Sequence, residues 1–216
     1  MLNQDQAWAI AKKIEGWCPE PQARKLYELA LRKSEGDVVE VGSWKGRSAV
    51  MIGAGVGAAG QGKMFTVDAG VGVDQWGAEG NRRESRRALN NGIQQFKADV
   101  SKRIGVDSHS VLTANMELAG LSDLVENIKA WSTEAVERFA DNSLSMLYID
   151  GSHLYEGVKE DFEVWSSKVV VGGVVAFDDS VHHVGVARLM GEIANLPEWT
   201  LESAPVANLT WFRKVA

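Results

Sequence analysis

The sequence predicts an α/β protein whose mostly parallel sheet is covered by helices on both faces. Short apolar runs alternate with segments of helical periodicity along most of the 216 residues. All four prolines lie near the two ends, which leaves residues 22–196 free to form long helices and central strands. The chain length and a hydrophobic content of 45% support one sizeable core. We therefore expect a single domain over residues 1–216.

The expected elements follow in chain order. Residues 5–16 and 21–34 have helical spacing, so residues 1–35 are expected to form a helical pair that packs on the domain or across a dimer. Strands are expected at 38–41, 63–68, 125–131, 144–150 and 172–179. Helices are expected from about residue 48, at 110–120, 133–140 and 183–195, and around Val158, Phe162, Trp165 and Val169. The segment "WTLESAPVANLTWFRKVA" is expected to close the chain as an antiparallel hairpin.

Residues 70–108 interrupt this alternation and are interpreted as an insertion. They begin with a glycine-rich stretch that carries Trp76 and continue as a polar, mostly basic helix. Two interpretations are open: a solvated surface excursion, or a lid over the strand ends with Trp76 as its apolar contact. The arginines at 82, 83, 86 and 87 are better explained as a solvated helix face than as a grip for an anionic substrate.

Composition limits the class of partner. A formal net charge of −6 argues against a general nucleic-acid or anionic-membrane binder. The one cysteine, Cys18, has no partner for an internal disulfide, which favours a reducing compartment. No apolar run approaches the roughly 20 residues of a membrane helix, and the N-terminal residues lack the apolar core of a signal peptide. A cytoplasmic protein is expected.

The residues that end the expected strands carry most of the functional signal, because parallel sheets bind ligands outside the carboxyl ends of their strands. These residues are Glu40, Asp68, Trp131, Asp150, Asp178 and Asp179. Five of the six are acidic. Carboxylates gathered along one edge would repel each other unless a positive group binds there.

A glycine loop follows the first expected strand in "VEVGSWKGRSA", where Gly42 and Gly46 let the backbone approach a ligand. The loop lacks the third glycine of the dinucleotide fingerprint and the GK[ST] of a phosphate-binding loop. Glu40 would repel a pyrophosphate but attract a cationic ligand. Asp68 is suited to accept hydrogen bonds from ribose hydroxyls, although a turn cap is the simpler alternative. Together these residues favour a nucleoside site.

Five segments, "VEVGSWKGRSA", "TVDAG", "AWSTEA", "IDGSHLYEGVKED" and "GGVVAFDDS", occur in an order that resembles class I S-adenosylmethionine-dependent methyltransferases. The resemblance is to the small O-methyltransferases of the catechol and caffeoyl-CoA type. It extends equally to the bacterial family related to macrocin O-methyltransferase and cephalosporin hydroxylase. The resemblance covers about residues 36–68 and 109–180. It implies a Rossmann-like, seven-stranded sheet.

The resemblance also implies roles for individual residues. The implied cofactor-binding residues are Glu40, Gly42, Ser43, Trp44, Gly46, Ser48, Asp68, Trp131, Ser132, Thr133 and Asp150. The implied metal ligands are Asp150, Asp178 and Asp179, and His153 occupies the place of the family's catalytic lysine. There are three departures: Asp179 stands where the catechol type usually has asparagine, His153 replaces the lysine, and the 70–108 insertion has no counterpart in compact members.

The implied chemistry is methyl transfer to a hydroxyl of a small molecule. A divalent cation bound to the acceptor oxygens would lower the pKa of the hydroxyl, and oxygen ligands point to Mg²⁺, or to Mn²⁺ or Ca²⁺. Asp150 would then be a ligand, and His153 would take the proton or hold the acceptor.

Simpler readings and other functions stay open. Asp150 or Ser152 could simply cap the following helix, and the histidine could be a surface residue. Functional rivals are a metal-independent N- or O-methyltransferase with His153 or Asp178 as base, an enzyme of another class, and a non-catalytic nucleoside-binding module. Tryptophans in the end segments favour a homodimer.

Overall fold

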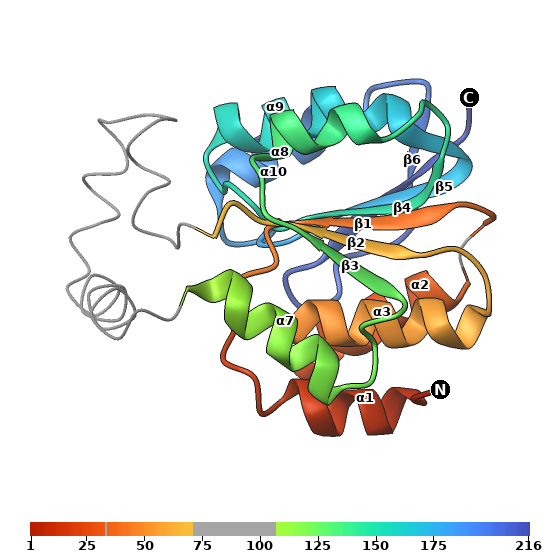
Figure 1. The fold of residues 1–216 in the computed structure, drawn as a ribbon. Coiled ribbons are helices and arrows are strands. Elements are labelled where there is room, and N and C mark those ends of the chain that lie inside the picture. The colour runs from red at the N-terminus through yellow and green to blue at the C-terminus, as the bar shows by residue number, and fades with distance from the viewer. Residues whose placement is uncertain (33, 71–106) are drawn as a thin grey trace.

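The computed structural model describes residues 1–32, 34–70 and 107–216. Its centre is a seven-stranded sheet of order β3-β2-β1-β4-β5-β7-β6 (Figure 1). The strands are β1 (Asp37–Val41), β2 (Met64–Val67), β3 (Val125–Ile128), β4 (Leu144–Ile149), β5 (Val169–Phe177), β6 (Trp199–Leu201) and β7 (Thr210–Lys214). The first five strands pair in parallel, whereas β7 runs antiparallel between β5 and β6. The predicted fold class and the C-terminal hairpin are confirmed.

Helices cover both faces of the sheet (Figure 1). One face carries α1 (Gln4–Ala11), α2 (Glu20–Leu31), α3 (Arg47–Ala59) and α7 (Ser108–Leu118). The other carries α8 (Ser132–Ala135), α9 (Tyr155–Trp165) and α10 (Val184–Ile193), with short 3₁₀ turns η1 (Val136–Arg138) and η2 (Ser166–Lys168). This two-sided cover is the arrangement that the alternating sequence pattern predicts.

The central strands supply the core on both sides of the sheet. All six residues of β4 are buried, as expected for a strand covered on both faces. Alternate side chains of β1 enter different clusters: Val38 packs with α2 and α3, whereas Val39 and Val41 pack with α9 and α10. Glu40 therefore points, like Val38, toward the face covered by α2 and α3.

Some predicted boundaries were wrong. The first helix ends at Ala11 instead of residue 16. β3 ends at Ile128, so Trp131 does not end a strand but caps the four-residue helix α8, and a 3₁₀ turn replaces the rest of the expected helix. Val169 begins β5 instead of ending α9, because the β-branched run continues through a left-handed Gly172. The sheet register shifts at this point, as in a β-bulge.

The proposed insertion at 70–108, with Trp76 and the arginine cluster, lies outside the described residues except at its two edges. At the far edge, Asp107 accepts a hydrogen bond from the backbone of Ser110 and caps α7, which begins at Ser108. In the described ranges, no helix combines the length and the apolar character needed to cross a membrane.

Candidate active site

The carboxyl ends of β1, β4 and β5 form the candidate site. These strands are neighbours, and Ile149 pairs with both Val41 and Phe177. The residues that follow, Gly42, Asp150 and Asp178, therefore lie in one row at the edge of the sheet. This register brings Asp150 and Asp178 to one edge of the sheet, where the sequence pattern predicted them.

Glu40 is a fully buried carboxylate on the α2/α3 face of β1. Neither of its oxygens has a hydrogen-bond partner among the described residues. Burial raises the pKa of Glu40 to about 7. The nearby hydroxyls of Ser48 and Ser43 lower this pKa in part, although neither lies in hydrogen-bond geometry with the carboxylate. The hydroxyl of Ser43 is itself buried without a partner. Buried polar atoms are normally paired, so these orphaned groups suit a polar or cationic ligand.

The glycine loop brings the ends of β1 and β4 together. Gly42 has φ +84°, and a Cβ atom there would lie 2.3 Å from the carbonyl oxygen of Asp150. Trp44, also left-handed at φ 48°, stacks at a tilt on Trp17 with ring centroids 5.9 Å apart. Gly46 is the N-cap residue of α3, and a side chain there would meet Leu112 of α7. Only glycine allows the close approach at residue 42.

Asp68 follows β2 and orders the glycine loop. Its Oδ2 accepts hydrogen bonds from the backbone nitrogens of Ser43 (3.0 Å) and Trp44 (2.7 Å), and its Oδ1 accepts one from Gly70 (2.7 Å). The sequence did not indicate this contact with the loop. A carboxylate has about four acceptor sites, which leaves capacity for the ribose hydroxyls expected there.

Three of the implied cofactor-binding residues, Trp131, Ser132 and Thr133, lie at the start of α8. Trp131 and Thr133 are exposed, and the hydroxyl of Ser132 accepts a hydrogen bond from Trp165 Nε1 at 2.8 Å. Asp161 of α9 is buried close by, and burial raises its pKa to about 6, an effect that the Ser132 hydroxyl partly offsets. A Cβ atom on Gly151 would lie 3.1 Å from Asp161 Oδ2, so this carboxylate reaches the loop after β4.

Asp150 and Asp178 form a crowded pair of carboxylates. Asp178 is buried, and Asp150 is partly covered. Burial, followed by the charge of Asp178 and a hydrogen bond to it, raises the pKa of Asp150 well above its ordinary value. Tyr148 donates a hydrogen bond to Asp150 Oδ2 (3.3 Å), and the Gln22 amide donates one to Asp178 Oδ1. Like charges this close fit a cation.

His153 belongs to two groups of possible metal ligands, and the three predicted aspartates are divided between these groups. Asp150, His153 and Asp178 offer ligand atoms within 4.8 Å of one another, and so do His153, Asp179 and His183. His153 Nε2 lies 3.5 Å from Asp150 Oδ1 and 3.8 Å from Asp179 Oδ2. The three aspartates do not fall in one such group. Burial lowers the pKa of His153, against the opposing charges of Asp179 and Asp178.

The donors in these two groups fit a divalent cation. They combine carboxylate oxygens, which suit Mg²⁺ and Mn²⁺, with imidazole nitrogens, which suit transition metals. His183 contributes to the second group, with Nε2 3.1 Å from Asp179 Oδ2, and it was not among the predicted site residues. Asp179 has φ 50°, a strained conformation typical of functional turns.

Several residues of the site were not predicted. Gln22, Cys18 and Tyr148 are buried beneath the aspartates, and Asn208 lies beside Asp179. Burial raises the pKa of the Cys18 thiol, and the charges of Asp178, Asp150 and Glu40 add to this effect. Tyr148 shares a sheet face with Asp150 by strand periodicity, a signal that could have revealed it.

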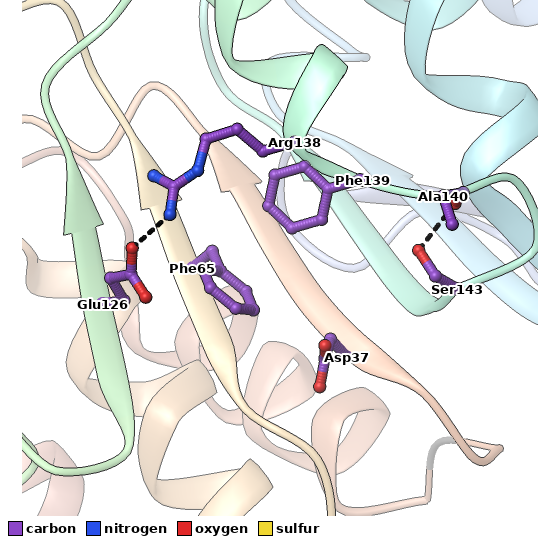
Figure 2. Close-up of a pocket in the computed structure, with 7 residues that line it drawn as sticks. All are labelled: Asp37, Phe65, Glu126, Arg138, Phe139, Ala140 and Ser143. Atoms are coloured by element: carbon purple, nitrogen blue, oxygen red, sulfur yellow. Dashed lines mark hydrogen bonds and ion pairs between the residues drawn. The ribbon is translucent and has the colours of Figure 1, made fainter.

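A separate pocket lies at the opposite, amino-terminal ends of the strands. Figure 2 shows its lining, with Asp37 at the start of β1 and Ser143 just before β4. Its volume is about 420 Å³, and the ion pair between Arg138 and Glu126 (2.5 Å) spans one side. It contains none of the predicted site residues.

The sheet order with its reversed β7 defines the class I methyltransferase fold. A family model described as "Methyltransferase domain" matches residues 39–180, well over half of the chain. The chain belongs to this family. The match includes the glycine loop, Asp150 and the 178–179 pair.

Individual relatives agree with this family. Over 149 residues, or 67% of its length, the chain is 28% identical to the 8-demethyl-8-(2,3-dimethoxy-alpha-L-rhamnosyl)-tetracenomycin-C 4'-O-methyltransferase of Streptomyces olivaceus. This chain spans 52% of the length of that methyltransferase and 10% of the length of another curated relative.

Solved structures share the fold, and two O-methyltransferases are among them. The O-methyltransferase NovP has a TM-score of 0.71 at 18% identity, over 93% of this chain and 84% of that chain. The O-methyltransferase TomG from Streptomyces achromogenes, solved in complex with SAM, has a TM-score of 0.65 at 14% identity, over 100% and 92%.

Proposed function

We propose that the chain transfers a methyl group from S-adenosylmethionine to a hydroxyl of a small molecule, with the help of a divalent cation. Family membership supports methyl transfer, and the similar proteins named as O-methyltransferases support an oxygen acceptor. The TomG structure in complex with SAM supports this cofactor. When bound, S-adenosylmethionine supplies an electrophilic methyl group next to a sulfonium.

Glu40 and the glycine loop are the proposed contacts of the methionine part of the cofactor. The orphaned carboxylate of Glu40 offers two acceptors to a cationic amino group, and Ser43 and Ser48 add hydroxyls beside it. Gly42, Trp44 and Gly46 shape the loop. Asp68 would accept the ribose hydroxyls, and Trp131, Ser132 and Thr133 would border the adenine.

Asp150 and Asp178, which share one ligand group, are the proposed ligands of the cation, and Asp179, in the neighbouring group beyond His153, is the third ligand that the resemblance implies. A cation bound there would lower the pKa of the acceptor hydroxyl and fix its angle of attack. His153 would receive the proton of this hydroxyl, because its imidazole faces both Asp150 and Asp179. Asp150 would share in holding the acceptor.

One observation carries this proposal: the unpartnered Glu40 and the aspartate pair meet at one rim, around Gly42. A metal-independent methyltransferase is the second candidate. The contact of His153 with Asp150 favours it, since an imidazole held by a carboxylate is a competent base without a cation.

Methyl-labelled S-adenosylmethionine, offered with a panel of phenols, diols, glycosides and amines, tests both candidates by mass spectrometry. Labelled ether products that form with Mg²⁺ or Mn²⁺ and disappear in chelator would support cation-assisted transfer. Undiminished product in chelator would favour the metal-independent candidate. Product labelled on nitrogen alone would contradict the proposed hydroxyl acceptor.

A further inference from the structure

Three neutral side chains each engage one oxygen of one rim aspartate. The contacts are Tyr148 Oη to Asp150 Oδ2 at 3.3 Å, Gln22 Nε2 to Asp178 Oδ1, and Asn208 Nδ2 to Asp179 Oδ1 at 3.1 Å. The second oxygens of Asp150 and Asp179 face His153, at 3.5 and 3.8 Å. Each of the three carboxylates thus has one oxygen that accepts a hydrogen bond from a neutral side chain.

We propose that Tyr148 and Gln22 are positioning residues that aim the second oxygens of Asp150 and Asp178 at the cation, and that Asn208 does the same for Asp179 of the neighbouring group. This inference rests on the proposed function, because it assigns these residues a task toward the proposed cation. Partners behind the ligands commonly fix the orientation of metal-binding carboxylates. None of the three belongs to the predicted ligand set.

Gln22 gives the strongest support. It is fully buried on α2, and its amide nitrogen donates to both Asp178 and the hydroxyl of Tyr148, 3.1 Å away. Its own oxygen is buried with no partner in the described part of the chain. The reverse amide orientation would point that oxygen at the Asp178 carboxylate, so donation to Asp178 fixes the side chain. An apolar residue would avoid a costly unpartnered oxygen, and packing alone therefore does not explain a glutamine here.

The same amide sets the direction of the Tyr148 hydroxyl. Because the tyrosine oxygen accepts from Gln22, its proton is left to point at Asp150 Oδ2. One glutamine thereby orients the ligands at the ends of both β4 and β5. Neutral donors suit this task, since a lysine or arginine in their place would neutralise the charge meant for the cation.

Two variants of the full chain test the inference: Gln22→Met, which keeps the side-chain length, and Tyr148→Phe, which removes only the hydroxyl. Gln4→Met is the matched control, because Gln4 belongs to the same helical pair but bonds the backbone of Arg24. Calorimetry would measure Mn²⁺ affinity in the presence of S-adenosylhomocysteine, together with the affinity for S-adenosylhomocysteine itself and the thermal midpoint.

Both site variants are expected to bind Mn²⁺ roughly tenfold more weakly, with unchanged affinity for S-adenosylhomocysteine, while Gln4→Met binds Mn²⁺ normally. Unchanged Mn²⁺ affinity in both site variants would overturn the inference and leave the proposed function standing. A parallel loss of S-adenosylhomocysteine binding would also overturn it, since the defect would then be general. No Mn²⁺ binding by the unaltered chain would remove the cation proposal and this inference together.

Discussion

Gln22 on α2 donates a hydrogen bond to Asp178 at the end of β5, across 156 residues of sequence. The N-terminal helical pair therefore does not only cover the sheet. Helix α2 packs on α3, and its Gln22 side chain contacts Tyr148 and Asp178 in the candidate site. Changes in these helices are therefore expected to affect the aspartate rim as well as the core.

Glu40→Gln is expected to change how stability depends on pH. Burial raises the folded-state pKa of Glu40 from 4.5 to about 7, so the carboxyl must lose its proton in an unfavourable place as pH rises through this window. The unaltered, ligand-free chain should lose roughly 3 kcal/mol of stability from this group between about pH 4.5 and pH 8. Urea unfolding at several pH values would show a loss smaller by this amount in the variant, because Asp150 and Asp161, whose pKa values burial also raises, titrate in both chains.

The exposed Glu137→Gln is the control for this experiment, since its side chain lies outside the core. It should follow the unaltered chain at every pH. If Glu40→Gln and the unaltered chain gave parallel curves, the buried carboxyl would not titrate as described.

Gly42→Ala should be far more damaging than Gly60→Ala. Both glycines have a left-handed φ, +84° and +72°, but only at residue 42 would a Cβ atom meet another strand end, 2.3 Å from Asp150. We expect about 1 kcal/mol of destabilisation at residue 60 and at least about 2 kcal/mol more at residue 42. Thermal and urea unfolding compare the two, and equal losses would contradict the close approach.

Asp178→Asn is expected to lose cation binding and to gain stability. Removing one of two crowded carboxylates relieves repulsion of Asp150, and an asparagine oxygen still accepts from Gln22. The cation-free variant should gain about 1 kcal/mol of stability and lose Mn²⁺ binding. The exposed Asp123→Asn should do neither. Full Mn²⁺ affinity in the Asp178 variant would exclude this carboxylate as a ligand.

His183→Ala, compared with His182→Ala, tests the choice of cation. Only His183 falls in a ligand group, and its neighbour is a matched exposed histidine. Because imidazole suits transition metals, loss of His183 should weaken Co²⁺ binding roughly tenfold and leave Mg²⁺ binding nearly unchanged. Cobalt absorption spectra of the two variants measure this difference, and equal spectra would assign the histidine no part in the site.

The acids of the rim were predictable because strand ends share an edge. Glu40 lies one residue before the end of β1, Asp150 and Asp178 directly follow β4 and β5, and parallel pairing places all three near one edge of the sheet. Strand periodicity also places Tyr148 on the face of Asp150, although the near-continuous apolar run hid this alternation.

Contacts between distant elements were not predictable. Helical spacing shows that α2 buries one face, but it does not say which strand end Gln22 will meet. The division of the aspartates between two groups depends on the left-handed turn at Asp179 and on Asn208, which returns from the hairpin. The end of β3 at Ile128 was not predicted either, and Trp131 caps α8 instead of ending a strand.

Calorimetric titration of S-adenosylhomocysteine into the unaltered chain, first in chelator and then with Mg²⁺ or Mn²⁺, tests most directly whether a nucleoside and a cation share this rim. We expect one nucleoside per chain under both conditions, weaker binding in Glu40→Gln, and a separate cation-binding signal that disappears in Asp178→Asn. A folded chain that bound no S-adenosylhomocysteine under either condition would contradict the assignment of this rim as a methyltransferase active site.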